Sequence, residues 1–133
     1  MTLSACQTAL GQLAGGEGYV GFSQVLFLAG ARSLVLSLWK VDDNATALLM
    51  TRFYQNLLGK RDGLKQPLPK ARALAEAKQW LRSLTPQEAE RLLKALPSSE
   101  RGMKEGTISA PKQAKLYEHP YYWSAFILLG DPN

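Results

Sequence analysis

The first residue with potential for covalent chemistry is Cys6, which follows the short stretch Thr2-Leu3-Ser4-Ala5 and begins a glycine-rich segment. That stretch can close a strand, and in α/β proteins reactive groups collect where strands end. Backbone N–H groups of a following turn would help to hold a cysteine there as the thiolate. The alternative is a small core residue, because free cysteine is among the most buried residue types.

A second group of candidates follows the apolar run Ser33–Trp39, which fits a strand buried on both faces. Trp39 stands at its end, and Asp42 and Asp43 precede a periodic helix. Either aspartate can cap that helix, and a carboxylate left free would form an acidic wall for a cationic ligand. Both roles can be filled at once, one by each aspartate. Trp39 is either a core residue or the floor of a pocket.

Two further patterns each allow two interpretations. His119 precedes Pro120 at the start of the last predicted strand, where it could partner Cys6 or simply pack beside aromatic residues. Residues 16–21 match G-x-G-x-x-G, and Asp42 lies 21 residues after the last of these glycines, as in a dinucleotide-binding fingerprint. Ten residues separate Ala5 from the first glycine, however, whereas the fingerprint needs its glycines directly after the strand. A turn before a helix is the alternative.

The elements that must position these residues alternate between strands and helices. The periodicity and the capping signals predict a short strand at 2–5, helices at 19–30, 45–57, 68–84 and 85–96, and strands at 33–39 and 121–130. A polar segment with glycine and proline predicts a mobile loop at about 98–117. This order indicates an α/β fold with a mostly parallel sheet.

Composition narrows the class of protein. The chain has 133 residues, of which 46% are apolar and 20% charged, as in a globular domain. No apolar run reaches the roughly 18 residues of a membrane span, and the first residues lack the basic region of a secretory signal. One cysteine and one histidine exclude an internal disulfide and an ordinary transition-metal site. We therefore expect a cytoplasmic protein with no metal, no cofactor and no membrane contact.

The net charge of +5 comes entirely from residues 59–133, which hold thirteen basic and eight acidic side chains. Most of them alternate in sign at helical spacing, which is typical of solvated helix faces. A nucleic-acid surface would need basic residues clustered on one face. We expect no nucleic-acid partner.

Several segments, taken together and in order, resemble the CHAT domains, a caspase-like family often found after tetratricopeptide repeats. The resemblance rests on five segments: Leu3–Gly11, Gly16-Glu17-Gly18, Ala29–Ser33, Ser37–Asp43 and His119–Phe126. It is dense over residues 3–59 and good over 119–131, and the combination is specific although no single piece is.

The resemblance implies a caspase-like α/β/α sandwich, of which residues 1–133 form the C-terminal portion. It also implies a His–Cys dyad in which Cys6 attacks a peptide carbonyl and forms an acyl-enzyme. Similarity to the related separases implies that Asp43, with Asp42 and Trp39 beside it, lines the pocket for the residue before the scissile bond. An acidic pocket favours Arg or Lys in a protein or peptide substrate.

One departure from the family pattern bears on activity. In this family the catalytic His lies upstream of the cysteine, whereas His119 matches a later His-Pro motif. We therefore expect a chain that is inactive alone, with the upstream half of the domain and helical repeats as its partners in a longer parent. The alternatives are a non-catalytic interaction fragment of a degenerate domain and a dinucleotide-binding module.

Overall fold

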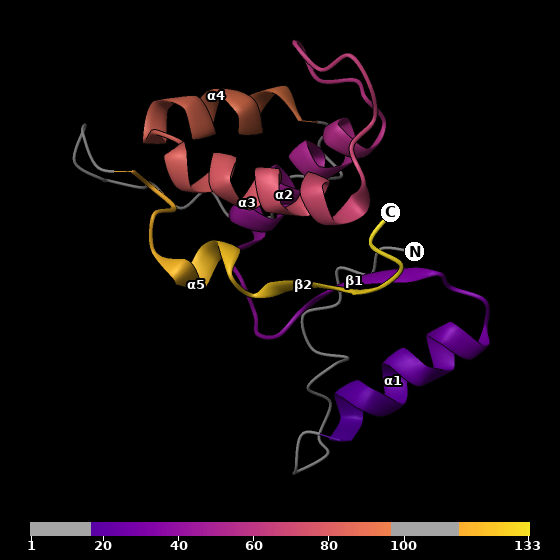
Figure 1. Cartoon of the computed structure of the whole chain (residues 1–133). Helices are drawn as coiled ribbons and strands as arrows, with labels where there is room; N and C mark the ends of the chain where they lie inside the picture. Colours follow the sequence, from indigo (N-terminus) through magenta and orange to yellow (C-terminus); the bar gives the residue numbers. More distant parts are fainter. Residues whose placement is uncertain (1–16, 97–114) are drawn as a thin grey trace.

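A computed structural model of the chain describes residues 17–96 and 115–133. The elements in this part are the helices α1 (Glu17–Leu28), α2 (Asp43–Leu57), α3 (Lys70–Ser83), α4 (Pro86–Ala95) and α5 (Pro120–Trp123), and the strands β1 (Ser33–Ser37) and β2 (Phe126–Gly130). Helices α2, α3 and α4 lie on one side of the strand pair and α1 lies on the other (Figure 1). Within the two described ranges no helix is long and apolar enough to cross a membrane.

Strands β1 and β2 pair in antiparallel fashion, with Ser33 opposite Gly130 and Ser37 opposite Phe126. The prediction of a mostly parallel sheet is therefore wrong for this pair, and the predicted strand at 2–5 lies outside the described residues. The reason is that α5 precedes β2 and contacts Trp39 and Lys40, which follow β1, so the chain runs back along β1 from there. The mixture of helices and strands agrees with the predicted α/β class.

The last predicted strand is shorter than expected because its first residues form a helix. His119 caps α5, and Pro120 occupies the first helical position, where its missing N–H costs nothing. The aromatic residues at 121–123 consequently lie in a helical turn, and only Phe126–Gly130 extends as strand. Gly130 has φ of 91°, and a Cβ there would lie 2.4 Å from the carbonyl oxygen of Arg32, so only glycine fits.

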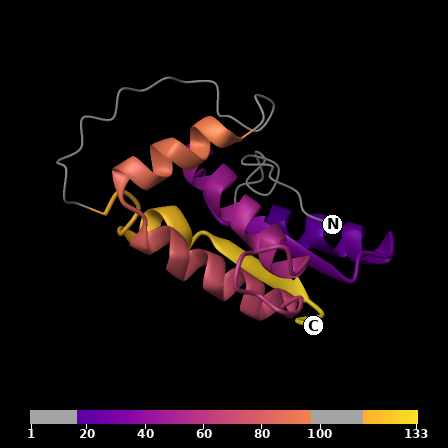
Figure 2. The same cartoon turned by 90° about the horizontal axis from the view of Figure 1, so that it is seen from above.

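The core forms between α2, α3 and one face of the strand pair. The periodicity that predicts a helix at 45–57 is confirmed in α2, where the apolar residues Ala45, Leu49 and Phe53, spaced four apart, are all buried. In β1 the residues from Ser33 to Leu36 are all buried, which confirms a strand covered on both faces. Seen from above, α3 runs beside β2 and α5 (Figure 2). The capping box of α4 is also confirmed, with Thr85 and Glu88 bonded to each other's backbone N–H groups.

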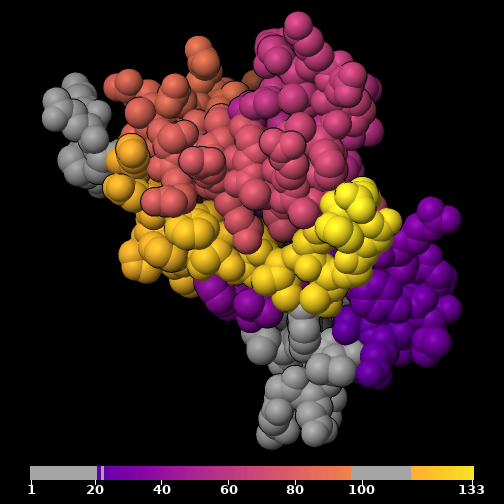
Figure 3. Space-filling view, in the orientation of Figure 1, coloured from indigo at the N-terminus to yellow at the C-terminus, as the bar shows by residue number. Residues whose placement is uncertain are grey.

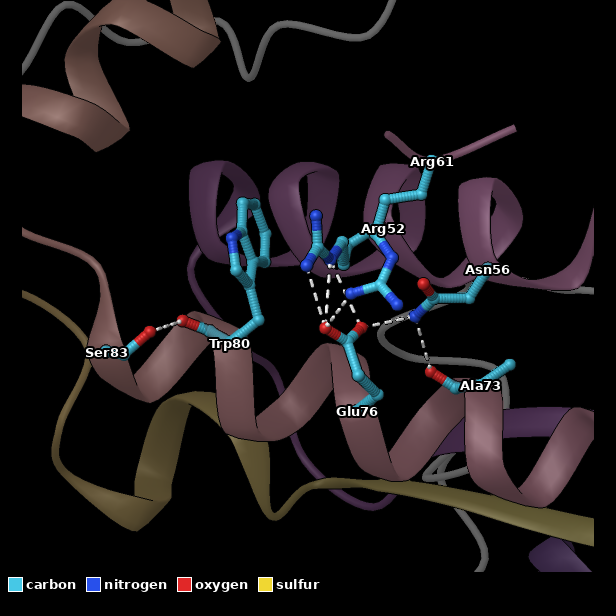
Figure 4. A network of polar contacts seen from close by, with 7 residues as sticks. All are labelled: Arg52, Asn56, Arg61, Ala73, Glu76, Trp80 and Ser83. Carbon is cyan, nitrogen blue, oxygen red and sulfur yellow. Dashed lines mark hydrogen bonds and ion pairs between the residues drawn. The ribbon is translucent and has the colours of Figure 1, made fainter. Parts of the chain in front are cut away.

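A polar cluster on Glu76 joins α2 to α3 (Figure 4). Arg52 binds the Glu76 carboxylate through Nε and through Nη2, the latter at 2.7 Å, and Nη1 of Arg61 binds it at 2.9 Å. Asn56, which is fully buried, donates to the same carboxylate and to the carbonyl of Ala73. The Arg52 guanidinium also lies 4.9 Å from the ring centroid of Trp80. The Glu76 carboxylate therefore links α2, α3 and the turn between them through hydrogen bonds.

Candidate functional site

The candidate site lies where β1 ends and α2 begins. Asp42 is the N-cap of α2, and its carboxylate accepts a hydrogen bond of 3.0 Å from the backbone N–H of Ala45. The carbonyl of Asp42 also accepts from the backbone N–H and the hydroxyl of Thr46. The carbonyl oxygen and one carboxylate oxygen, Oδ2, of Asp42 are therefore bonded to the first turn of the helix, which confirms the capping role predicted for one of the two aspartates.

Asp43 is the first residue of α2, and its side chain is exposed. Among the described residues it makes no hydrogen bond or ion pair. The N-terminal end of a helix carries a partial positive charge, which stabilises a carboxylate in this position. Both aspartates are exposed, but they differ in their bonds: the Asp42 carboxylate caps the helix, and the Asp43 carboxylate has no partner among the described residues.

Trp39 is half-buried and joins the end of β1 to α5. Its indole Nε1 donates a hydrogen bond of 3.0 Å to the carbonyl oxygen of Tyr121, and the two rings stack with centroids 6.4 Å apart. It also packs against the core cluster. The structure therefore supports the core role, because the tryptophan packs against the core cluster, and its role as the floor of a pocket stays a prediction.

Tyr117 is a residue near the site that sequence reasoning missed, since it fell within the predicted loop at about 98–117. Of that segment the structure describes residues 115–117, and Tyr117 is only 2% exposed there. Burial raises the pKa of the Tyr117 phenol, and the negative charge of Asp42 raises it further. Its hydroxyl has no hydrogen-bond partner among the described residues. An aromatic residue that ends a polar segment just before His-Pro was the available signal.

His119 is exposed, and its Nδ1 accepts a hydrogen bond of 3.1 Å from the backbone N–H of Tyr121. In this geometry the imidazole caps α5 through Nδ1, so only Nε2 is left for another partner. Cys6 lies outside the described residues, so the hypothetical pairing of His119 with Cys6 stays a prediction.

The glycine pattern at 16–21 is described only in part. Gly18 and Gly21 both lie inside α1, which begins at Glu17, while Gly16, the glycine that would form the turn, lies outside the described residues. In the fingerprint, the first glycine forms the turn between a strand and its helix, and the second lets the backbone approach the pyrophosphate. Inside a helix, the N–H of Gly21 is directed along the helix axis toward the preceding turn.

The order of these features along the chain agrees with a comparison against protein families. The model of the CHAT domain family matches residues 1–131. The chain therefore belongs to the CHAT domain family, a family related to caspase-like peptidases. No curated protein and no solved structure matches the chain.

Proposed function

We propose that the chain is the C-terminal portion of a CHAT-type cysteine endopeptidase domain, with Cys6 as its nucleophile. The observation that supports this most strongly is that only one of the two aspartates at the start of α2 is used as the helix cap. Asp42 supplies the helix cap, so the Asp43 carboxylate is exposed and has no partner in the part of the chain that the structure describes. A purely structural helix start needs one cap, and the second aspartate is then free to bind a cation.

The reaction proceeds through a thioester. The Cys6 thiolate attacks the carbonyl carbon of the scissile peptide bond, and the C–N bond breaks as the departing amine takes a proton from a general acid. Water, deprotonated by the same group, then hydrolyses the thioester and returns the thiolate. Backbone N–H groups, that of Cys6 among them, would hold the negative oxygen of the tetrahedral intermediate.

The proton-transfer group is the part that these 133 residues do not supply. Their single histidine is His119, and because its Nδ1 accepts a hydrogen bond as the cap of α5, the neutral imidazole carries its proton on Nε2, which can donate but not accept. The proposal therefore assigns the general base to polypeptide outside this chain, namely the upstream half of the domain in a longer parent. We propose that the parent is cytoplasmic and that helical repeats precede the domain.

Asp43 would select the residue before the scissile bond. An ion pair at an exposed position is worth about 0.2–1 kcal/mol, whereas a sheltered, charge-assisted hydrogen bond is worth about 1.5–3 kcal/mol. A bound peptide shelters the carboxylate from water, so we place the preference for Arg or Lys at the lower end of the sheltered range. That corresponds to about a tenfold preference over an uncharged residue of the same size.

The proposal can be tested without a complete dyad by alkylating Cys6 with a chloromethyl ketone, whose chloride leaves as the C–S bond forms. The two reagents are a lysyl compound and its norleucyl analogue, which keeps most of the aliphatic stem but lacks the ammonium group. The full 133-residue chain should react about tenfold faster with the lysyl compound. A Cys6→Ser variant shows that the label is on Cys6.

The matched variants are Asp43→Asn and Asp42→Asn. Because asparagine caps a helix about as well as aspartate, both variants should fold normally. Asp43→Asn should reduce the rate ratio to about 1, since no charge then faces the ammonium group, and Asp42→Asn should leave the ratio near its original value. A ratio near 1 in the unmodified chain would refute the acidic pocket and favour the non-catalytic interaction fragment. A loss confined to Asp42→Asn would mean that the two carboxylates have the opposite roles.

A further inference from the structure

Tyr121 is exposed, yet its side chain and its backbone both make hydrogen bonds to neighbouring residues. It is 45% exposed, but its hydroxyl donates a hydrogen bond of 2.5 Å to the carbonyl oxygen of Lys40. Its own carbonyl accepts from the indole of Trp39, and its ring stacks on the same indole. Its backbone N–H donates to Nδ1 of His119. The residue therefore joins α5 to the segment Trp39–Asp43 through both its main chain and its side chain.

Within that segment Trp39, Lys40 and Val41 belong to neither a helix nor a strand, so their position depends on such contacts. Leu38 is the last residue that continues the pairing of β1 with β2, because its N–H donates to the carbonyl of Ala125. Val41 is anchored by burial, with 2% exposure, and Asp42 by the helix cap. Between these fixed points, the Tyr121 hydroxyl fixes the carbonyl of Lys40, and Asp43 follows three residues later.

The helical turn that carries Tyr121 is itself held from α3. The guanidinium of Arg82 lies 4.8 Å from the ring centroid of Trp123, and the Trp123 indole donates to the carbonyl of Glu118 at 3.2 Å. The segment from α5 through β2 lies against α3 as a continuous band on the surface (Figure 3). Helix α5, which carries Tyr121, is consequently held by α3 as well as by the segment that Tyr121 contacts.

We propose that Tyr121 is a positioning residue that sets the direction of the Asp43 carboxylate toward a basic side chain of the substrate. The inference rests on the proposed function, because it assumes that Asp43 receives that side chain. With the Lys40 peptide fixed, the start of α2 and the carboxylate at its first position are held before substrate binds. Without the hydroxyl, the peptide of Lys40 is free to rotate, and part of the binding free energy must be used to order it.

The test uses Tyr121→Phe, which removes the hydroxyl and keeps the stacked ring, in the full 133-residue chain. The ratio of the lysyl to the norleucyl alkylation rate at Cys6 should fall about threefold or more, the effect of one net hydrogen bond, while the norleucyl rate stays unchanged. Tyr54→Phe is the matched control, since Tyr54 is 41% exposed and its hydroxyl has no partner among the described residues. That variant should keep the original ratio.

A second readout separates positioning from a general loss of stability. In two-dimensional amide NMR spectra, Tyr121→Phe should speed hydrogen exchange at Ala45 and Thr46, whose N–H groups bond to Asp42, and leave exchange in α3 unchanged. An unchanged rate ratio in Tyr121→Phe, in a chain where Asp43→Asn abolishes the preference, would overturn this inference and leave the proposed function standing. A ratio near 1 in the unmodified chain would overturn both together. Equal losses with the two reagents would show that Tyr121 acts on the thiol or the fold instead.

Discussion

Replacing Glu76 with glutamine should destabilise the chain more than any other neutralisation of a described carboxylate. Glu76 receives hydrogen bonds from Arg52, Arg61 and Asn56, and so holds two helices and the turn between them. Burial raises its pKa, but the hydrogen bonds from Arg52 and Asn56 and the charges of both arginines outweigh burial and lower the pKa below 4.5. The folded state therefore favours the ionised carboxylate.

The magnitude follows from the kind of contact that is lost. A charge-assisted hydrogen bond contributes about 1.5–3 kcal/mol, but the bonds share one carboxylate and are not additive. The Glu76 side chain is also 27% exposed, so solvent screens part of the interaction. We expect Glu76→Gln to lower the free energy of unfolding by about 2 kcal/mol, or Tm by roughly 7 °C for a chain of this size.

The lowered pKa of Glu76 determines how the effect of Glu76→Gln on stability changes with pH. A lowered folded-state pKa contributes stability above the unfolded-state value, and that contribution disappears as pH falls through the folded-state pKa. The difference between the unmodified chain and Glu76→Gln should therefore be complete at pH 7 and should disappear on acidification below 4.5, the ordinary value. Urea unfolding followed by circular dichroism over this pH range measures it.

Glu90→Gln is the matched control, because Glu90 pairs with Lys94 on the surface of α4, where both side chains are about 70% exposed. It should leave the unfolding midpoint unchanged. Equal midpoints for the unmodified chain, Glu76→Gln and Glu90→Gln at pH 7 would refute the reasoning. A destabilisation by Glu76→Gln that persisted unchanged at pH 3 would show that the effect is one of shape and not of charge.

Two further predictions concern the buried phenol and the missing base. Tyr117→Phe removes a buried hydroxyl that has no hydrogen-bond partner among the described residues, so the free energy of unfolding should stay the same or rise by up to about 1 kcal/mol. A loss of 1 kcal/mol or more in urea unfolding would show that the hydroxyl has a partner. The 133-residue chain alone should show no turnover of Arg or Lys reporter peptides, because general-base catalysis contributes about 10²–10⁴-fold and Nδ1 of the single histidine is engaged. Turnover that Cys6→Ala abolishes and His119→Ala also abolishes would contradict this and assign the base to His119.

The sequence was most informative where a pattern acts locally. The capping box at Thr85 and the apolar stripe of α2 depend on residues three or four positions apart, and both are confirmed. The direction of β2 could not be predicted in the same way. It depends on the turn formed by His119 and Pro120, which converts strand-like aromatic residues into α5.

The helix cap at the candidate site could be predicted from the sequence only as one of two aspartates. The capping pattern allowed either Asp42 or Asp43, since either spacing allows a cap, and only the resemblance to separases favoured Asp43 as the free carboxylate. The structure makes that assignment through the Ala45 N–H, which bonds to Asp42. The contact of Tyr121 with Lys40 was not predictable, because it joins residues 81 positions apart.

The central claim is that Cys6 attacks a peptide whose basic residue binds Asp43. The most direct measurement is a crystal structure of the 133-residue chain after alkylation by the lysyl chloromethyl ketone. Our account predicts a C–S bond to Cys6 and an ammonium nitrogen within about 4 Å of the Asp43 carboxylate, the distance of an ion pair. An adduct on Cys6 whose ammonium group lies in solvent or beside another carboxylate, with Asp43 still unpaired, would contradict it.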